Sequence, residues 1–471
     1  MVLSRKWLYS CGILLALFIA LFLSGCGSDT KLEQGYYKEI VVKANGELIG
    51  KHKLSEKEAK KAGLTYYVTM DETNKDQVKK VTSVYNCDIT SNRTWNIEGE
   101  LWDSQFASLV ITPQDNGFMK YEFLDAVGQG KEGFWGAYTI RYRIDPESKR
   151  ATVAYLYDKS GNNKVISMGN YLRAAQMQFG YDKENRLIKI TPADESGNQV
   201  RAEPIGGKGL SSVQIGYDEK KKDRIQSISW VNVGGNLVMG SNWAKEEFSY
   251  DDKGRVIAKS YFREDGRPIE TGISGTVDTS DVFSTRLLVN TLTKIEGCLV
   301  SGGAVTKYTY EGDNWYPSKI SCFGIGGQSF GDQSEIQLEY DPFGNVTRYS
   351  VYGADGLPRK FMKGENITSL GLEYDDWGQI SREIFYQGDN KTAIHKWNGA
   401  YCRAVAEIQF TYDKHGRTTS ESYFDANDAP NGIYFAEFEV NKTIHKVFID
   451  YDTKEIVCYS ANGDEIYRER M

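Results

Sequence analysis

Four histidines and many carboxylates are the residues of this chain that could support acid–base or metal chemistry. The histidines are His52, His395, His415 and His445. They form no HExxH motif and no other spacing typical of a metal site. Many aspartates recur at one position of a repeated turn, as do Asp251, Asp341, Asp375 and Asp413. Such a repeat is explained by the turn itself, so we assign no catalytic residue, metal ligand or cofactor.

Two glycine-rich stretches, Val231–Gly240 and Phe323–Gly331, have a composition that could bind phosphate. They stand at the same phase of a repeat and no helix pattern follows either, which favours matching turns over phosphate loops. Asp425, Asn427 and Asp428 resemble a calcium loop in composition but lack the glycine and closing glutamate of an EF-hand. A turn is the expected structure there as well.

The repeat is clearest in Tyr250–Pro268, Tyr340–Pro358 and Tyr412–Pro430, which align without a gap. Each has a turn of the form Asp-x-x-Gly, an extended apolar run, and a second turn that ends at proline. Glycine is suited to close such turns because it accepts positive φ. The expected turn glycines are Gly254, Gly344, Gly378 and Gly416.

Weaker copies extend the series along the chain. Units open at Ile144, Tyr181, Tyr217, Tyr250, Tyr310, Tyr340, Tyr374, Tyr412 and Tyr451. Most steps between these starts are 30 to 39 residues, and one step of 60 predicts a degenerate copy or an insertion near Val282–Val300. A period in the thirties is typical of a repeat architecture.

Two aromatic residues, Phe343 and Trp377, occupy a turn position where another unit has Lys253. Exposed aromatic turn tips are unfavourable unless they are covered or used. Packing on a neighbouring repeat is the favoured interpretation, and a recognition face for glycan or protein is the alternative.

The openings Tyr250-Asp251…Gly254-Arg255 and Tyr412-Asp413…Gly416-Arg417 resemble the YD repeats of the Rhs family. The resemblance implies β-hairpins that wind into a continuous curved sheet. The second half of each unit, aromatic-x-x-Asp-Gly-x-Pro, departs from the usual family continuation. Only 20 residues follow Tyr451, which is too few for a toxin domain. Other short bacterial hairpin repeats, such as MORN-like variants, share this local pattern.

Residues 1–25 have the features of a signal peptide, with basic Arg5 and Lys6 before an apolar stretch. The sequence Leu23-Ser24-Gly25-Cys26 closely resembles the bacterial lipobox, which implies diacyl modification of Cys26 and a membrane anchor. A plain membrane anchor with an incidental cysteine is the alternative. Gly27 is not the aspartate that retains lipoproteins on an inner membrane. We therefore expect the outer membrane in a two-membrane cell, and otherwise the outer face of the plasma membrane.

Residues 26–34 form a polar tether, residues 35–143 a β-rich region, and residues 144–471 the hairpin repeats. Within residues 35–143, Val41–Gly50 predicts a hairpin around Asn45-Gly46. The segment from Ser55, with Glu58 completing a capping box, predicts a short helix that ends at Gly63. The predicted fold class is mainly β, with tandem antiparallel hairpins in one continuous curved or wound sheet.

The composition restricts the partners. The net charge of −7 becomes about −9 after removal of Arg5 and Lys6, which argues against binding to nucleic acid. Besides Cys26, the chain after the signal peptide has five cysteines and no CxxC pair. Free buried thiols are favoured, and a Cys298–Cys322 pair is the alternative. We expect a lipid-anchored binding or scaffold protein that recognises envelope polysaccharide or protein. The alternative is an exported hydrolase whose site lies in residues 35–143.

Overall fold

The computed structural model describes most of the chain after the predicted signal peptide. The described residues are 32–63, 65–84, 93–97, 104–125, 127–163, 166–168, 172–200, 209–221, 224–239, 243–270, 303–360, 366–397, 400–413, 417–434 and 443–470. Cys26, Gly416 and the segment Val282–Val300 lie outside them.

The described chain begins with the hairpin predicted around Asn45-Gly46. Strand β1 (Gly35–Val42) pairs antiparallel with β2 (Leu48–Leu54), and Gly46 has a φ of 83°. Helix α1 (Glu56–Lys61) follows, and Ser55 and Glu58 form the predicted capping box. Strand β1 also pairs with β3 (Thr65–Met70), so this region joins one end of the main sheet. Both local predictions are confirmed.

The remaining strands follow in chain order. Before the first tyrosine unit they are β4 (Val78–Val84), β5 (Arg93–Ile97), β6 (Ser104–Phe106), β7 (Ser108–Gln114), β8 (Phe118–Leu124), β9 (Thr139–Ile144), β10 (Ala151–Tyr157), β11 (Ile166–Met168) and β12 (Leu172–Ala174). Next come β13 (Gln176–Tyr181), β14 (Leu187–Ala193), β15 (Ser212–Tyr217), β16 (Ile225–Val231), β17 (Lys245–Tyr250), β18 (Val256–Phe262), β19 (Val305–Thr309), β20 (Lys319–Phe323), β21 (Glu335–Tyr340), β22 (Val346–Tyr352), β23 (Ser369–Tyr374) and β24 (Ile380–Gln387). The last are β25 (Asn390–Lys391), β26 (Ile394–Trp397), β27 (Ala400–Val405), β28 (Glu407–Tyr412), β29 (Thr418–Phe424), β30 (Gly432–Tyr434), β31 (Lys446–Asp450), β32 (Glu455–Tyr459) and β33 (Glu465–Arg470).

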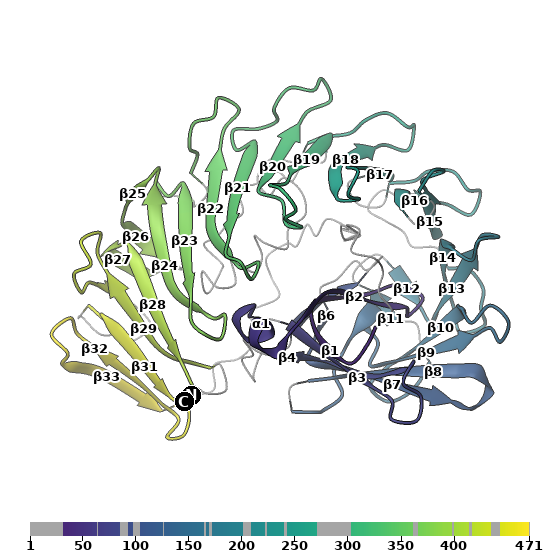
Figure 1. Ribbon diagram of the computed structural model, residues 1–471, viewed down its shortest axis with the longest axis horizontal. Helices are drawn as coiled ribbons and strands as arrows, with labels where there is room; N and C mark the ends of the chain where they lie inside the picture. Colours follow the sequence, from purple (N-terminus) through teal and green to yellow (C-terminus); the bar gives the residue numbers. More distant parts are fainter. Residues whose placement is uncertain are drawn as a thin grey trace.

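Within the described residues, one sheet of 28 strands contains most of these elements, and β5 and β6 belong to it through a parallel pairing of β5 with β1. Consecutive hairpins lie side by side, so the sheet forms an open arc from the purple strands through blue and green to yellow (Figure 1). Among the described strands, β33 pairs with β32 alone, and the sheet is not closed. The predicted fold class is confirmed. The sheet continues across residue 144, because β9 pairs with both β8 and β10.

Each unit is a hairpin with two different turns. At the first turn the pairing register shifts just before the opening tyrosine, as between Ser249 and Tyr250. At the second turn an isolated bridge joins the aromatic residue to the proline, as in Phe262–Pro268, Tyr352–Pro358 and Phe424–Pro430. The first turn of the predicted repeat therefore joins the two strands of a hairpin, and the second turn follows the outgoing strand.

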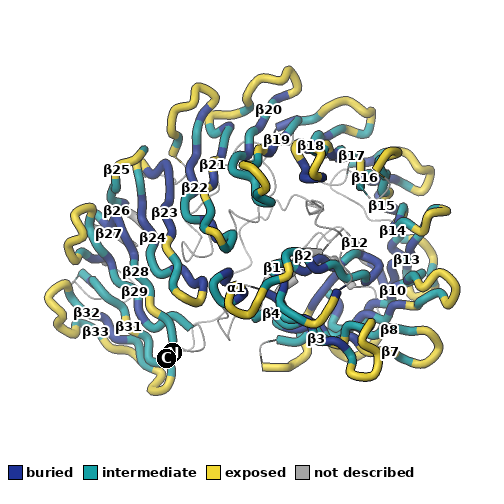
Figure 2. Tube along the Cα trace, viewed as in Figure 1, coloured by how far each residue is buried: buried dark blue, intermediate teal, exposed yellow. Residues whose placement is uncertain are grey.

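The core follows the arc along the sheet. It includes the buried side chains of Trp230, Phe385 and Tyr423. Exposed residues gather at the turns, most visibly along the outer rim (Figure 2). No helix in the described part of the chain has the length and apolar character needed to cross a membrane.

Candidate functional site

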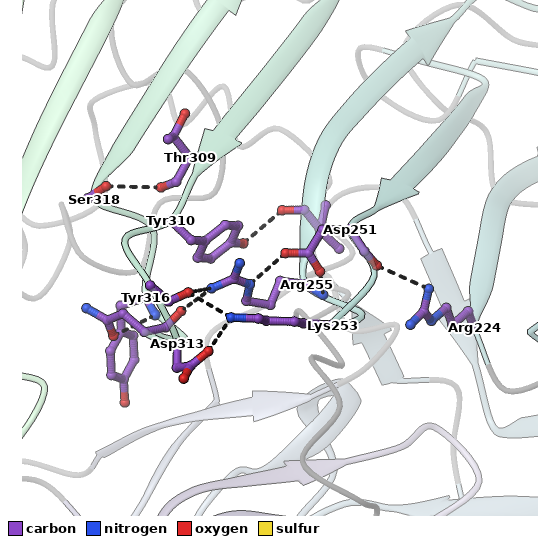
Figure 3. A network of polar contacts seen from close by, with 12 residues as sticks. Arg224, Asp251, Lys253, Arg255, Thr309, Tyr310, Asp313, Tyr316 and Ser318 are labelled. Carbon is purple, nitrogen blue, oxygen red and sulfur yellow. Dashed lines mark hydrogen bonds and ion pairs between the residues drawn. The ribbon is translucent and has the colours of Figure 1, made fainter.

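The contact between successive units explains the repeated Tyr-Asp-x-x-Gly-Arg motif (Figure 3). The hydroxyl of Tyr310 donates a 2.8 Å hydrogen bond to the main-chain oxygen of Val256, in the preceding unit. The Arg255 guanidinium lies 4.5 Å from the centroid of the Tyr310 ring, and its Nε donates to Asp251 Oδ2 at 2.7 Å. Burial raises the pKa of Asp251, but hydrogen bonds from Arg255 outweigh it and leave that pKa below its ordinary value.

The same tyrosine contact recurs along the arc. In seven units of the described part of the chain the hydroxyl donates, over 2.5–3.0 Å, to a main-chain oxygen at or near the start of a strand in the preceding unit. The pairs are Tyr181–Ala151, Tyr217–Leu187, Tyr250–Ile225, Tyr310–Val256, Tyr340–Pro317, Tyr374–Val346 and Tyr412–Ile380. Because these tyrosines bond one unit to the next, the motif has a structural role.

The predicted turn glycines lie in the left-handed region. The φ values of Gly254, Gly344 and Gly378 are 85°, 79° and 67°. A Cβ at Gly344 would come within 2.6 Å of Tyr316 Cε2. A Cβ at Gly378 would come within 2.5 Å of the Cα of Gly63, at the end of α1. These two turns therefore lie against neighbours that leave no room for a larger residue.

Of the four units with an Asp-x-x-Gly turn, two replace the arginine of the motif, with Asn345 in one and Gln379 in the other, and both residues are buried. Asn345 Nδ2 donates to Asp341 Oδ2 at 2.9 Å and to the main-chain oxygen of Lys61 at 3.0 Å. Lys38 Nζ on β1 donates to the Ala62 oxygen at 2.5 Å and to Asn345 Oδ1 at 3.4 Å. The turn of this unit is therefore bonded to the end of α1.

The predicted ligand-face residues Phe343 and Trp377 lie on the same side as α1. Lys61 Nζ is 5.6 Å from the centroid of the Phe343 ring, and Lys60 Nζ is 5.7 Å from that of Trp377. Trp377 is nevertheless 52% exposed. The structure thus places both aromatic turns against the N-terminal region, where sequence reasoning favoured contact with another repeat.

A solvent-open pocket of about 590 Å³ lies over β24, β28, β29 and β31. On β28 and β29, Ile408 and Tyr423 pack in the core, so their neighbours Gln409 and Ser422 point to the other face of the sheet. The lining residues are Ser381, Arg382, Glu407, Gln409, Phe410, Thr411, Ser420, Ser422, Phe424, Asp428 and Lys446. We call this set the repeat pocket. It offers hydroxyl, amide and charged groups together with aromatic carbon.

Glu407 is the carboxylate around which the charged groups of the repeat pocket are arranged. Arg382 donates to both of its carboxylate oxygens at 2.7 Å, Gln409 donates at 2.7 Å, and Lys391 donates at 2.5 Å. Lys391 also donates to Asp428 at 2.5 Å. Burial raises the pKa of Glu407, but these donors outweigh it and hold the pKa at about 2. The network fixes the side chains in one arrangement and keeps the carboxylate ionised.

Sequence reasoning did not identify the repeat pocket, although one signal was present. Glu335-Ile336-Gln337 and Glu407-Ile408-Gln409 occupy the same place before a unit tyrosine. Gln337 donates to Glu335 at 2.7 Å, as Gln409 does to Glu407. The recurrence indicates paired polar side chains on one face, but the partner Arg382 lies on another strand.

The remaining candidates lie in structural contacts. Gly235 and Gly327 both have a φ of 78°, in matching turns. The Asp425 carboxylate accepts hydrogen bonds from the amides of Asn427 and Ala429, as a turn aspartate does. His445 Nδ1 lies 2.7 Å from the main-chain oxygen of Tyr423. In the part of the chain that the structure describes, no three His, Cys, Asp or Glu residues are grouped so as to hold a metal ion.

The cysteines differ from the favoured prediction at one position. Cys458 is a buried free thiol, as expected. Cys322 is disulfide-bonded, so the free-thiol prediction is wrong there. Its partner is not Cys458, which is free, and Cys298 lies outside the described residues. The alternative pair Cys298–Cys322 stays a prediction.

No family model and no curated protein matches this chain. Among solved structures it is similar to a chain of the Photorhabdus luminescens Tc holotoxin pore, at 12% identity and a TM-score of 0.30, over 86% of this chain and 18% of that one. A porin-like protein from Bacteroides uniformis matches at 10% identity and a TM-score of 0.21, over 68% and 88%. A TcdB2–TccC3 structure matches at 11% identity and a TM-score of 0.17, over 93% and 25%. The chain thus spans about a quarter or less of the two toxin chains.

Proposed function

We propose that this chain is a lipid-anchored extracytoplasmic protein that acts as a scaffold and binds an envelope polysaccharide or protein through its repeat sheet. The anchor is the lipid on Cys26, and the site is the repeat pocket. The proposal places the protein on the outer membrane of a two-membrane cell, or on the outer face of the plasma membrane of a single-membrane cell.

The observation that carries the binding proposal is the preorganised polar surface of the repeat pocket. Arg382, Glu407 and Lys391 hold one another in place, so little side-chain freedom is lost when a partner binds. Gln409 and the pocket hydroxyls add donors and acceptors, and Phe424 adds an apolar surface. Such a combination suits a partner that presents several hydroxyl or amide groups.

The binding test compares two equivalent glutamines. Gln409 lines the repeat pocket, whereas Gln337 makes the same intrastrand hydrogen bond on β21 outside it. Immobilised protein is incubated with envelope fractions, either intact, treated with protease, or depleted of polysaccharide. We expect Gln409→Ala to reduce capture of one component at least fivefold and Gln337→Ala to leave it unchanged. Equal capture by both variants would contradict the assigned site.

The anchoring test uses metabolic labelling with a fatty-acid analogue. We expect label on the wild-type protein, and an uncleaved, unlabelled precursor for Cys26→Ser. Label on the Cys26→Ser protein would contradict anchoring through this residue. A panel of hydrolase substrates runs in parallel, and turnover that a single carboxylate substitution abolishes would replace the scaffold proposal by an exported enzyme.

A further inference from the structure

Helix α1 connects the first strands of the sheet to turns that lie far along the arc. Figure 1 shows it inside the arc, beside the ends of β23 and β24. Lys61, the last residue of α1, bonds to Asn345 across 284 positions of the chain, and Lys38 on the adjacent strand β1 bonds to the same residue across 307. The ladder of strands couples each unit to its neighbours, whereas this contact crosses the space that the arc encloses. We infer that α1 is a releasable latch that fixes the curvature of the sheet and lies beside the aromatic turns at Phe343 and Trp377.

The latch is built on the C-terminal carbonyl groups of α1. The last carbonyls of a helix have no partner within the helix and need donors from elsewhere. The Lys61 oxygen accepts from Asn345 and the Ala62 oxygen accepts from Lys38. One donor thus comes from a repeat turn and the other from β1, so the helix end is shared between the two parts of the chain.

Close main-chain packing between Gly378 and Gly63 makes this contact specific for glycine. Gly378 lies so near Gly63 that a Cβ would meet its Cα at 2.5 Å and the Lys61 oxygen at 2.7 Å. Gln379 beside it is buried. The turn of the Tyr374 unit therefore fits the end of α1 only with glycine at position 378.

The remainder of α1 makes a weak contact, which is why the latch can release. The helix has six residues, of which Ala59 alone is buried. Helices of this length are marginal without tertiary packing. Segments with few buried groups open at low free-energy cost while the rest of a protein stays folded. Release would remove the contacts of Lys61 and Lys60 with the rings of Phe343 and Trp377 and expose both rings further.

The test compares two alanine substitutions with the same backbone strain. Gly378 and Gly356 have φ values of 67° and 74°, but a Cβ at Gly356 would have nothing within 4 Å. Hydrogen exchange is followed at the amides of Ala59 and Ala62, which bond within the helix. We expect exchange at least about tenfold faster in Gly378→Ala and wild-type exchange in Gly356→Ala. We also expect small-angle scattering to show a larger radius of gyration for Gly378→Ala alone.

Equal exchange and equal dimensions in the two variants would overturn the latch. If Gly378→Ala fails to fold, Asn345→Ala replaces it, because it removes a donor without adding an atom. Exchange in α1 that stays at the wild-type rate in Asn345→Ala would likewise contradict the inference.

Discussion

Asn345 donates a hydrogen bond of 3.0 Å to the main-chain oxygen of Lys61, from the repeat position at which Arg255 stands in an earlier unit. Arg255 reaches forward and lies over the ring of Tyr310 in the next unit. The shorter asparagine side chain bonds to the end of α1 instead. One position of the repeat therefore has two uses, which are coupling to the next unit and attachment of the N-terminal region.

The hydrogen bonds that tyrosine hydroxyls make between successive units, here called the tyrosine ladder, predict a measurable loss of stability when one hydroxyl is removed. Tyr374→Phe deletes the 2.6 Å hydrogen bond to the Val346 oxygen. A buried acceptor that loses its donor costs about 1–2 kcal/mol in the free energy of unfolding. Urea unfolding measures it, with Tyr467→Phe in the edge strand β33 as the control. Equal unfolding midpoints for both variants and the wild type would show that the ladder adds no stability.

The arginine of the motif predicts that a positive charge alone does not give the stability that its guanidinium group provides. Arg255 donates to Asp251 and to the main-chain oxygens of Gly312 and Asn314, at 2.7, 3.0 and 2.8 Å. Lysine keeps the charge but cannot reproduce this fork, so Arg255→Lys should lower the unfolding free energy by about 1–3 kcal/mol. Arg267→Lys, at a side chain that is 83% exposed, is the matched control and should change little. A loss of the same size in the control would contradict the prediction.

Glu407 predicts a loss of stability in acid. Its folded pKa is about 2, below the ordinary value of 4.5, so its contribution is fully present above pH 4.5. That contribution is lost as the pH falls from 4.5 toward 2, and amounts to at most about 3 kcal/mol. Urea midpoints of the wild type and Glu407→Gln should differ at pH 6 and converge near pH 2. A difference that does not change with pH would show that Glu407 is not held by its ionised contacts.

Lys38 predicts a gain of stability in alkali. Burial lowers its pKa from 10.5 to about 8, and the charges of Asp341 and Glu39 oppose part of that decrease. Between pH 8 and 10.5 the unfolded chain therefore binds the proton that the folded chain has lost, so stability from this group rises with pH. The unfolding free energy of the wild type, minus that of Lys38→Met, should rise over this interval. His52, which lies near Lys38, is neutral throughout it. A flat difference would contradict the lowered pKa of Lys38.

Much of the fold was predictable because the turns carry local signals. The left-handed turn at Gly254 and the hairpin at Asn45-Gly46 follow from residues within a few positions of one another. The capping box of Ser55 and Glu58 gives the helix for the same reason. The repeat period predicts a repeat architecture, and the resemblance to the YD repeats implies the continuous sheet.

The attachment of α1 and the repeat pocket could not be predicted in this way. The bond between Lys61 and Asn345 spans 284 positions and leaves no period in the sequence. Arg382 and Glu407 lie on neighbouring strands of different units, so their pairing depends on a register that turn chemistry alone does not give. Phe343 and Trp377 were recognised as unusual, but their contact with α1 depends on the curvature of the whole arc.

The central claim is that each tyrosine unit is an element of architecture coupled to its neighbours, and hydrogen exchange on Gly344→Val tests it most directly. Valine is strained at a φ of 79° and its Cβ would meet Tyr316, so we expect a loss of about 1–3 kcal/mol. Exchange should accelerate in the units that open at Tyr310, Tyr340 and Tyr374, while the units at Ile144 and Tyr181 keep wild-type rates. Wild-type exchange throughout the chain, or unchanged stability together with lost capture of an envelope partner, would contradict the claim.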